Sequence, residues 1–196
     1  MRPMGKKEAS LERLVAAAGR AFRKHGYAGI GVDGLAKGAK LTSGAFYFHF
    51  PSKLQAFVEI LKLGLEDLKK SVQSFQATEG QAWLTAFTAF YMGPVRTCDL
   101  SEGCALSALS SDVERGGYAA QSVYEAEIFD ISSTLAQGLE PSGTMTAREQ
   151  AWALLAMLSG GVTVARAVDD PTLGAEIADA VRKAIETQYH ARKISD

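Results

Sequence analysis

The 196-residue sequence has few of the residues that build metal or redox centres, and it has no long apolar run. It holds 2 cysteines and 3 histidines, with no C-x-x-C or H-x-x-x-H spacing. The uncharged run with strong apolar content at residues 151–165 is shorter than the roughly 18 residues that a membrane span needs. We therefore expect no metal site and no membrane span, and residues 151–165 should form a buried helix.

Signals for secretion and for common enzyme chemistry are also missing. The N-terminal stretch MRPMGKKEASLERL carries charge but no apolar segment that could act as a secretory signal, so we expect a cytoplasmic chain with reduced cysteines. No nucleophile elbow, phosphate loop or dinucleotide fingerprint occurs. The sequence therefore favours a protein that is not an enzyme, with no catalytic residues and no cofactor.

Charge is divided along the chain, although the formal net charge is only −1. Residues 1–53 contain ten Lys or Arg against three acidic residues, a balance of +7, and the remainder has eleven basic and nineteen acidic residues. Such asymmetry is typical of a basic head that binds a polyanion. Chance clustering on solvated helix faces would give the same count, so charge alone leaves both interpretations open.

Apolar residues recur at helical spacing throughout, and no stretch alternates like a strand, so we predict an all-α protein of about nine helices. The first helix should end near Gly26, and a short one over about residues 32–39 should have Gly31 at its N-cap. Another should begin after Thr42 as N-cap, and Ser52 should cap a long amphipathic helix of about six turns.

Capping signals also mark helices in the remainder of the chain. Thr78 with Gln81 predicts a capping box for a helix that ends before Pro94. Short helices are expected at about residues 105–111 and 118–137. Thr146 with Glu149 predicts a second capping box for residues 147–168, and the last helix should begin at residue 171.

The two short helices before residue 50 form a helix-turn-helix pattern, and the second of them carries five consecutive rings, residues 46–50. A helix turns only part of its circumference toward its own core. Phe46 and Phe50 share one face and should be buried, so Tyr47 and His49 should point elsewhere, and Phe48 is not assigned. The alternative is that all five rings pack in an apolar interface.

The segments AFRKHGY and VDGLAKGAKLTSGAFYFHFPSK, within residues 14–53, resemble the N-terminal domain of the TetR family of transcriptional regulators. The order G-x-x-Y-x-H-F-x-S-K carries the resemblance, and GCALSALSSDV and ALLAMLSGGVTVARAVDDP look like the C-terminal half of one subset of the family. The resemblance implies a three-helix DNA-binding domain over residues 1–51. It also implies an all-helical ligand-binding and dimerisation domain over residues 52–196.

A recognition helix in the major groove needs small or polar residues at its start and phosphate donors on its flanks. Ser43 can bond a base edge, Ala45 can meet a thymine methyl, and small residues let the backbone approach. By similarity to the family, the side chains of Tyr47, His49 and Lys53 reach phosphates. Any phosphate contact at the start of the second helix must come from the backbone N–H groups of Gly31 or Val32. The candidate DNA-binding residues are Gly31, Val32, Thr42, Ser43, Gly44, Ala45, Tyr47, His49 and Lys53.

Lys40 stands where the family's turn usually has glycine, and a left-handed backbone there would cost on the order of 1 kcal/mol.

Aromatic residues gather in the helices that, in the family, surround a ligand cavity. Such a cavity suits an apolar or aromatic molecule, because no basic cluster lies in that region to neutralise phosphate. For any single ring, packing in the core is the alternative. The candidate ligand-binding residues are Trp83, Phe87, Phe90, Tyr91, Cys104, Tyr118, Tyr124 and Trp152.

These patterns predict a homodimeric repressor that binds double-stranded operator DNA and leaves it when a small molecule binds. Two alternatives remain open at this point. One is a small-molecule-binding protein whose helix-turn-helix is vestigial. The other is a thiol-redox-sensing regulator that uses Cys98 and Cys104, although the two cysteines could equally be ordinary packing residues.

Overall fold

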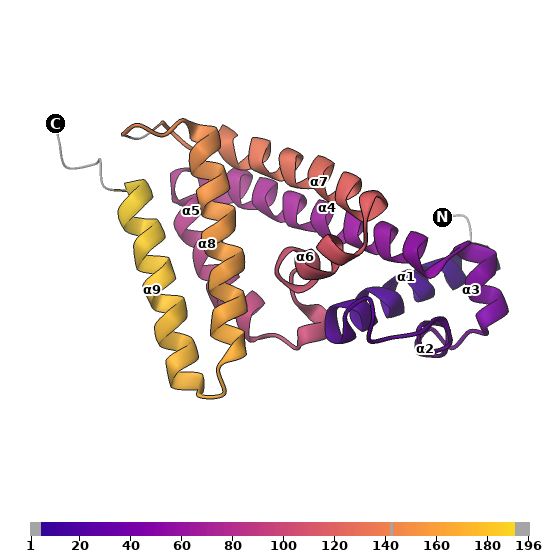
Figure 1. Cartoon of the computed structure of the whole chain (residues 1–196). Coiled ribbons are helices and arrows are strands. Elements are labelled where there is room, and N and C mark those ends of the chain that lie inside the picture. Colours follow the sequence, from indigo (N-terminus) through magenta and orange to yellow (C-terminus); the bar gives the residue numbers. More distant parts are fainter. Residues whose placement is uncertain (1–4, 142, 191–196) are drawn as a thin grey trace. The chain divides into compact units, whose positions relative to one another are not determined.

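A computed structural model describes residues 5–141 and 143–190, and within these ranges the chain is all-helical with no β-strand (Figure 1). The all-α prediction is therefore confirmed. Among the described residues, no helix combines the length and the apolar character that a membrane crossing requires. The α-helices are α1 (Lys6–His25), α2 (Val32–Gly38), α3 (Ser43–His49), α4 (Lys53–Glu79), α5 (Trp83–Phe90), α6 (Ala105–Arg115), α7 (Tyr118–Gln137), α8 (Ala147–Ala167) and α9 (Pro171–His190).

The chain divides into two compact units, each made of two stretches of sequence. Unit 1 comprises Met1–Leu65 with Asp99–Glu127, and unit 2 comprises Glu66–Cys98 with Ile128–Asp196. Helices α4 and α7 each contribute residues to both units. The expected division at residues 51 and 52 concerns function rather than compactness, and it stays a prediction.

Several helix starts are fixed by the side chains that the sequence indicates. Thr42 Oγ1 accepts the Ala45 N–H at 3.2 Å, and Ser52 Oγ accepts the Gln55 N–H at 3.1 Å. The capping box at α8 is complete, because Thr146 Oγ1 accepts the Glu149 N–H at 3.3 Å and Glu149 Oε2 accepts the Thr146 N–H at 2.7 Å. The bonds from the Thr146 N–H and hydroxyl hold the pKa of the Glu149 carboxyl below its ordinary value.

The predicted capping box at Thr78 and Gln81 is wrong. Helix α4 continues to Glu79, and a 3₁₀ turn, η1 (Gly80–Ala82), leads directly into α5. Because Thr78 lies inside α4, its hydroxyl donates to the Ser74 carbonyl at 2.9 Å instead of capping a new helix.

The α-helix that contains Trp83, α5, ends at Phe90 and so before Pro94, as expected, but helical backbone of another type continues beyond it. Pro94 lies inside a π-helical turn, η2 (Tyr91–Val95), and helical residues continue to Thr97. Proline lacks an N–H and its ring clashes with the preceding turn of a regular helix, and the wider π turn accommodates both effects. The guanidinium of Arg166 then satisfies carbonyls near this end, since its Nη2 donates to Val95 O at 2.8 Å and Cys98 O at 3.0 Å.

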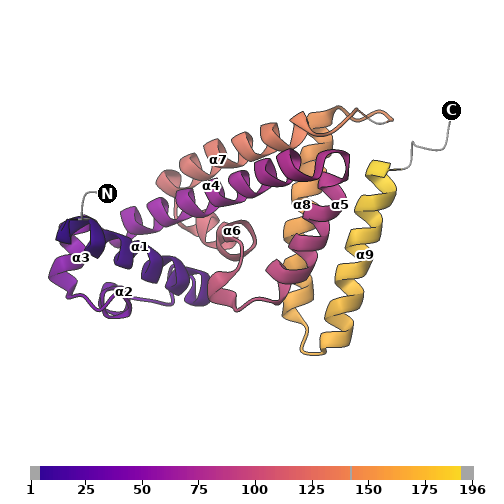
Figure 2. The ribbon, with the colours of Figure 1, turned by 180° about the vertical axis from the view of Figure 1, so that it is seen from behind.

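Unit 1 packs α1, α2 and α3 with the first turns of α4, and it also includes α6 (Figures 1 and 2). Its core contains fully buried Phe22 and Phe57, whose rings meet edge to face with centroids 5.4 Å apart. After α1, Gly26 takes φ 71°, and the following Tyr27 N–H donates to buried Asp112 Oδ2 at 3.0 Å. This bond attaches α6 to the end of α1.

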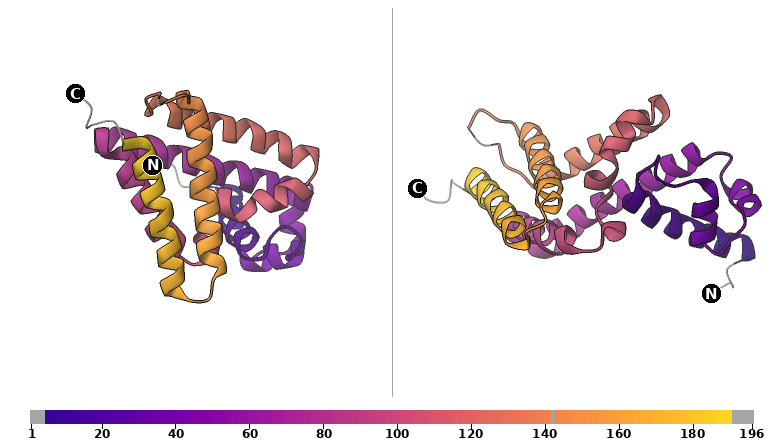
Figure 3. Two further views of the ribbon diagram at one scale, coloured as in Figure 1. Left: turned by 60° about the vertical axis from the view of Figure 1, so that its left-hand side comes forward. Right: turned by 60° about the horizontal axis from the view of Figure 1, so that its bottom comes forward.

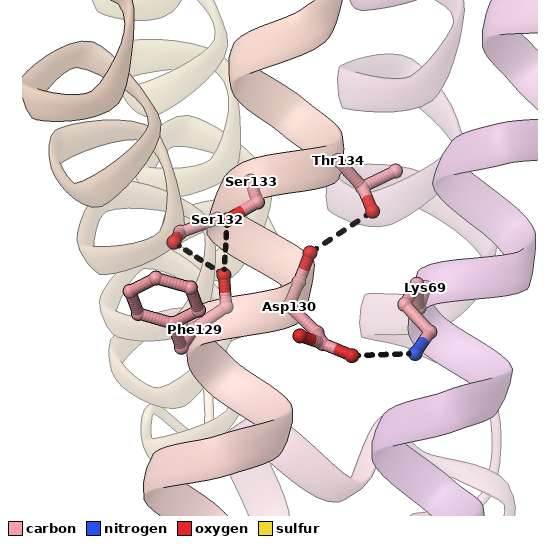
Figure 4. A network of polar contacts seen from close by, with 6 residues as sticks. All are labelled: Lys69, Phe129, Asp130, Ser132, Ser133 and Thr134. Atoms are coloured by element: carbon pink, nitrogen blue, oxygen red, sulfur yellow. Dashed lines mark hydrogen bonds and ion pairs between the residues drawn. The ribbon is translucent and has the colours of Figure 1, made fainter.

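In unit 2, α8 and α9 run side by side (Figures 1 and 3). Gly161 permits this approach, because a Cβ there would lie 3.1 Å from both Val181 methyl groups. In the same unit, Lys69 Nζ on α4 pairs with Asp130 Oδ2 on α7 at 3.1 Å (Figure 4). Figure 4 also shows three hydroxyls of α7 donating to carbonyls of its preceding turn, namely Ser132 and Ser133 to Phe129 O and Thr134 to Asp130 O.

Candidate nucleic-acid interface

The turn between α2 and α3 is closed by two backbone hydrogen bonds and by one residue in a left-handed conformation. Lys40 N–H donates to Lys37 O at 3.0 Å, and Leu41 N–H donates to Ala36 O at 2.9 Å. Lys40 has φ 57°, as its place in a glycine position predicts. This geometry sets the direction in which α3 leaves α2, at a cost of about 1 kcal/mol for a non-glycine residue.

Helix α3 divides its rings between the core and the surface. Phe46 is 0% exposed and Phe50 is 7% exposed, which confirms that they belong to the core. Tyr47 is 55% exposed and Phe48 is 68% exposed. The ammonium of Lys7, from α1, lies 5.2 Å from the centroid of the Phe48 ring. The outward side of α3 therefore carries two rings and a neighbouring cation.

Polar side chains on α3 are held by partners from the two preceding helices. Ser43 Oγ donates to Asp33 Oδ1 of α2 at 2.5 Å. At the other end of α3, His49 Nε2 lies 2.8 Å from Ser10 Oγ of α1. Both contacts reduce the freedom of side chains that would otherwise rotate at the surface.

The remaining DNA-binding candidates lie around this helix. Gly31 is exposed at the N-cap of α2 and Val32, which follows it, is half-buried. At the start of α3, Gly44 is exposed and Ala45 is half-buried. Lys53, the first residue of α4, places its ammonium 4.5 Å from the centroid of the Tyr27 ring. All nine candidates therefore belong to unit 1.

Two further residues belong to this surface and were not identified from the sequence. Lys7 contacts the ring of Phe48, and Asp33 contacts Ser43. Both were counted in the charge balance of residues 1–53, but neither stands close in sequence to α3. A charge count cannot show which charged side chain lies against the helix.

The ligand-binding candidates are divided between the two compact units. In unit 2, Trp83, Phe87 and Tyr91 are buried, whereas Phe90 and Trp152 are partly exposed. A further ring joins this group, because the centroid of Phe75 lies 5.6 Å from that of Phe87 and 5.4 Å from that of Phe90.

In unit 1, Cys104 and Tyr124 are half-buried, and Tyr124 Oη lies 3.1 Å from Ser110 Oγ. Tyr118 is 85% exposed, so unit 1 does not enclose its ring. The two cysteines belong to different units, and Cys98 Sγ accepts an N–H from Arg166 at 3.2 Å.

Residues 14–60 match the sequence model of a family described as "Bacterial regulatory proteins, tetR family". No curated protein sequence matches the chain. The matched residues run from α1 into α4, so they include the whole of α2, the turn and α3.

Solved structures are similar over nearly the whole chain. The reduced form of NemR from E. coli has a TM-score of 0.81 at 18% identity, covering 94% of this chain and 99% of that one. A TetR-family regulator from Agrobacterium tumefaciens has a TM-score of 0.79 at 17% identity, covering 92% and 99%. A TetR regulator from Chloroflexus aurantiacus has a TM-score of 0.79 at 20% identity, covering 95% and 98%.

These solved structures share the helical fold of this chain over nearly its whole length. The match over residues 14–60 confirms the resemblance drawn from the sequence, because it shows that this N-terminal segment is similar to the tetR family of bacterial regulatory proteins.

The turn gives a first testable prediction. Replacing Lys40 by Gly should raise the free energy of unfolding by roughly 0.5–1 kcal/mol, because glycine adopts φ 57° without a steric penalty. The matched change Lys37→Gly removes the same charge inside α2 and should lower that free energy by about 1 kcal/mol. Urea unfolding of the three proteins measures both effects. Equal destabilisation by the two variants would contradict the strain at Lys40.

Proposed function

We propose that this protein is a homodimeric repressor that binds operator DNA through α3 and is released from it by an apolar or aromatic small molecule. The observation that carries the proposal is the partly exposed start of α3, with Thr42 and Gly44 exposed, on the basic N-terminal part of the chain. Thr42, Ser43, Gly44 and Ala45 have side chains small enough for the backbone to approach base edges in the major groove.

Phosphate contacts would flank this reading surface. Tyr47 is exposed, so its hydroxyl can donate to a phosphate oxygen beside the groove, and the contact of His49 Nε2 with Ser10 holds the His49 ring at the same end of α3. Lys53 supplies a cation for a phosphate group. The backbone N–H groups of Gly31 and Val32, at the start of α2, are further candidate phosphate donors. The balance of +7 over residues 1–53 supports the same interpretation, since cations near the duplex release its counterions.

Dimerisation is supported by an uncharged outer face on α8. A stripe of exposed residues at spacings of three or four follows this helix, so its members share one face. A Cβ at Gly160 would meet nothing within 4 Å, in contrast to the tightly packed Gly161. A second copy related by a two-fold axis can bury this face. The α8 stripe consists of Trp152, Ala156, Gly160, Val164 and Ala167.

Effector binding in unit 2 is supported by a buried hydroxyl. Thr88 is 0% exposed, and its Oγ1 has no hydrogen-bond partner among the residues that the structure describes. An unsatisfied buried hydroxyl costs about 1–3 kcal/mol, and a ligand with a polar group could remove that cost. Thr88 lies on α5 with Trp83 and Phe87, and the π turn follows directly, a type of irregularity frequent at functional sites.

Release follows if the effector favours one of two dimer geometries. Two recognition helices must lie about 34 Å apart, one turn of DNA, to enter successive major grooves. A ligand that binds a dimer with different spacing more tightly shifts the population away from the DNA-binding form. Helix α4 is suited to transmit such a shift, because it is one unbroken helix from Lys53 to Glu79.

DNA binding is tested with duplex DNA from upstream of the protein's own gene. Lys53→Ala should weaken binding to all sequences alike. It should also reduce the slope of log binding constant against log salt concentration by about one per half-site, because one phosphate contact is lost. Lys183→Ala in α9 is the control for removing a charge elsewhere. An unchanged salt slope would remove Lys53 from the contacts. No binding by the unmodified protein would favour a small-molecule-binding protein with a vestigial helix-turn-helix.

Assembly is tested by light scattering at micromolar concentration, where the mass should be about twice the 20.9 kDa of one chain. Ala156→Arg should shift the mass toward one chain, because it places a charge within the α8 stripe. Gln73→Arg adds the same charge to an exposed position of α4 and should leave the dimer intact. A monomeric unmodified protein, or equal effects of the two variants, would overturn this part of the proposal.

The effector site is tested with Thr88→Val, which keeps the shape of the side chain and removes its hydroxyl. Without ligand the variant should be about 1 kcal/mol more stable, because the unsatisfied group is gone. A panel of aromatic and lipophilic compounds is scored for raising the melting temperature and for releasing DNA. Active compounds with a polar group should act more weakly on the variant. If only phosphorylated anionic metabolites were active, an apolar site would be wrong.

A further inference from the structure

The first residue of α3 is bonded to an acidic residue of α2. The hydroxyl of Ser43 donates to Asp33 Oδ1 at 2.5 Å, with Asp33 exposed and Ser43 half-buried. Only three acidic residues occur in residues 1–53. Asp33 is one of these three, and its bond to Ser43 places it beside the surface proposed to meet DNA, where a carboxylate would repel phosphate.

The bond determines which hydrogen-bonding role Ser43 can still play. A serine hydroxyl has one hydrogen and two lone pairs, whereas an ionised carboxylate can only accept. The single hydrogen of Ser43 is therefore directed at Asp33. Because the acceptor is charged, this bond is stronger than one between neutral groups. What Ser43 offers to any further partner is a lone pair.

Among the side chains of the first turn of α3, Ser43 differs from its neighbours in offering an acceptor whose own hydrogen is already used. Thr42 Oγ1 already accepts the Ala45 N–H at 3.2 Å, and the Thr42 hydroxyl keeps its hydrogen to donate. Gly44 and Ala45 have no polar side-chain atoms. The first turn of α3 thus presents a donor at Thr42 and an acceptor at Ser43.

We propose that Asp33 is a specificity-determining residue, which makes Ser43 an acceptor that recognises an exocyclic amino group, adenine N6 or cytosine N4. The inference rests on the proposed function, in which α3 enters the major groove. There the amino groups of adenine and cytosine are the donors, whereas guanine O6 and N7 and thymine O4 are acceptors. Because the Ser43 hydrogen is held by Asp33, the Ser43 oxygen can bond the amino groups of adenine and cytosine. The same oxygen is repelled by the acceptor atoms of guanine and thymine.

The charge of Asp33 acts in the same direction. Its carboxylate disfavours nearby base acceptors and phosphate oxygens, so it lowers affinity for DNA in general while it sharpens the choice at one position. Asp33→Asn should therefore bind unrelated duplexes more tightly. It should also discriminate less at the base that faces Ser43, because a neutral amide oxygen holds the serine hydrogen less strongly than a carboxylate does, and the hydrogen can then turn toward the DNA.

The experiment begins with selection of duplexes from a random library by the full-length protein. In the selected duplex, adenines are replaced one at a time by purine, which lacks the N6 amino group, and cytosines by pyrimidin-2-one, which lacks the N4 amino group. One such replacement should weaken binding about fivefold, as expected for one hydrogen bond. The same replacement should have no effect on Ser43→Ala, because the partner is already missing.

Variants at acidic positions then isolate the role of Asp33. Asp33→Asn should reduce the fivefold effect of the amino-group deletion to less than twofold, and Asp33→Ala should do the same without a side-chain amide. Glu12→Gln, on an exposed position of α1, changes the net charge by the same amount and should keep the full effect.

Three results would overturn the inference. One is a duplex in which no amino-group deletion depends on Ser43, and another is an Asp33→Ala protein, which has no acceptor for the Ser43 hydrogen, that behaves like Glu12→Gln. If the unmodified protein selects no duplex at all, the proposed DNA-binding function fails and the inference fails with it. The first two results leave DNA binding itself intact, so the failures are distinguishable.

Discussion

The burial of Phe46 and Phe50 is the constraint on which the proposed reading surface depends. Helix α3 has only 7 residues, and a helix of that length is not stable alone in water. It is held by the two rings on its inner face, and their burial fixes its rotation about its own axis. Tyr47, Phe48 and the small residues of the first turn face outward for that reason.

The position of α3 is fixed at both ends as well as along its inner face. At its start, the left-handed turn at Lys40 and the bond from Ser43 to Asp33 connect it to α2. At its end, His49 meets Ser10 of α1. A recognition element must hold its polar atoms in place before it meets DNA, because ordering them on binding would cost side-chain entropy. The three contacts remove much of that cost in advance.

Local signals predicted most of the fold, and contacts between distant residues account for what the sequence did not reveal. The caps at Thr42 and Thr146 involve neighbours three residues away, so the sequence alone indicates them. Pro94 correctly indicated that the regular α-helix ends before it, but the sequence did not show that a π-helical turn continues through it. The bond between Asp33 and Ser43 spans ten residues and a turn whose direction depends on packing. For the same reason, the sequence could not tell that Tyr118 is exposed.

The composition of unit 1 suggests how an effector could act on the reading surface. Helix α6 is not a neighbour of α1 in sequence, yet Asp112 accepts the Tyr27 N–H directly after α1 ends. Asp112 is buried, so this bond is shielded from water and resists separation more than a surface contact would. Under the proposed function, a displacement of α6 would therefore carry the end of α1 with it. Because Tyr27 also meets Lys53 and Phe57 of α4, the same displacement would reach the helix that begins directly after the reading surface.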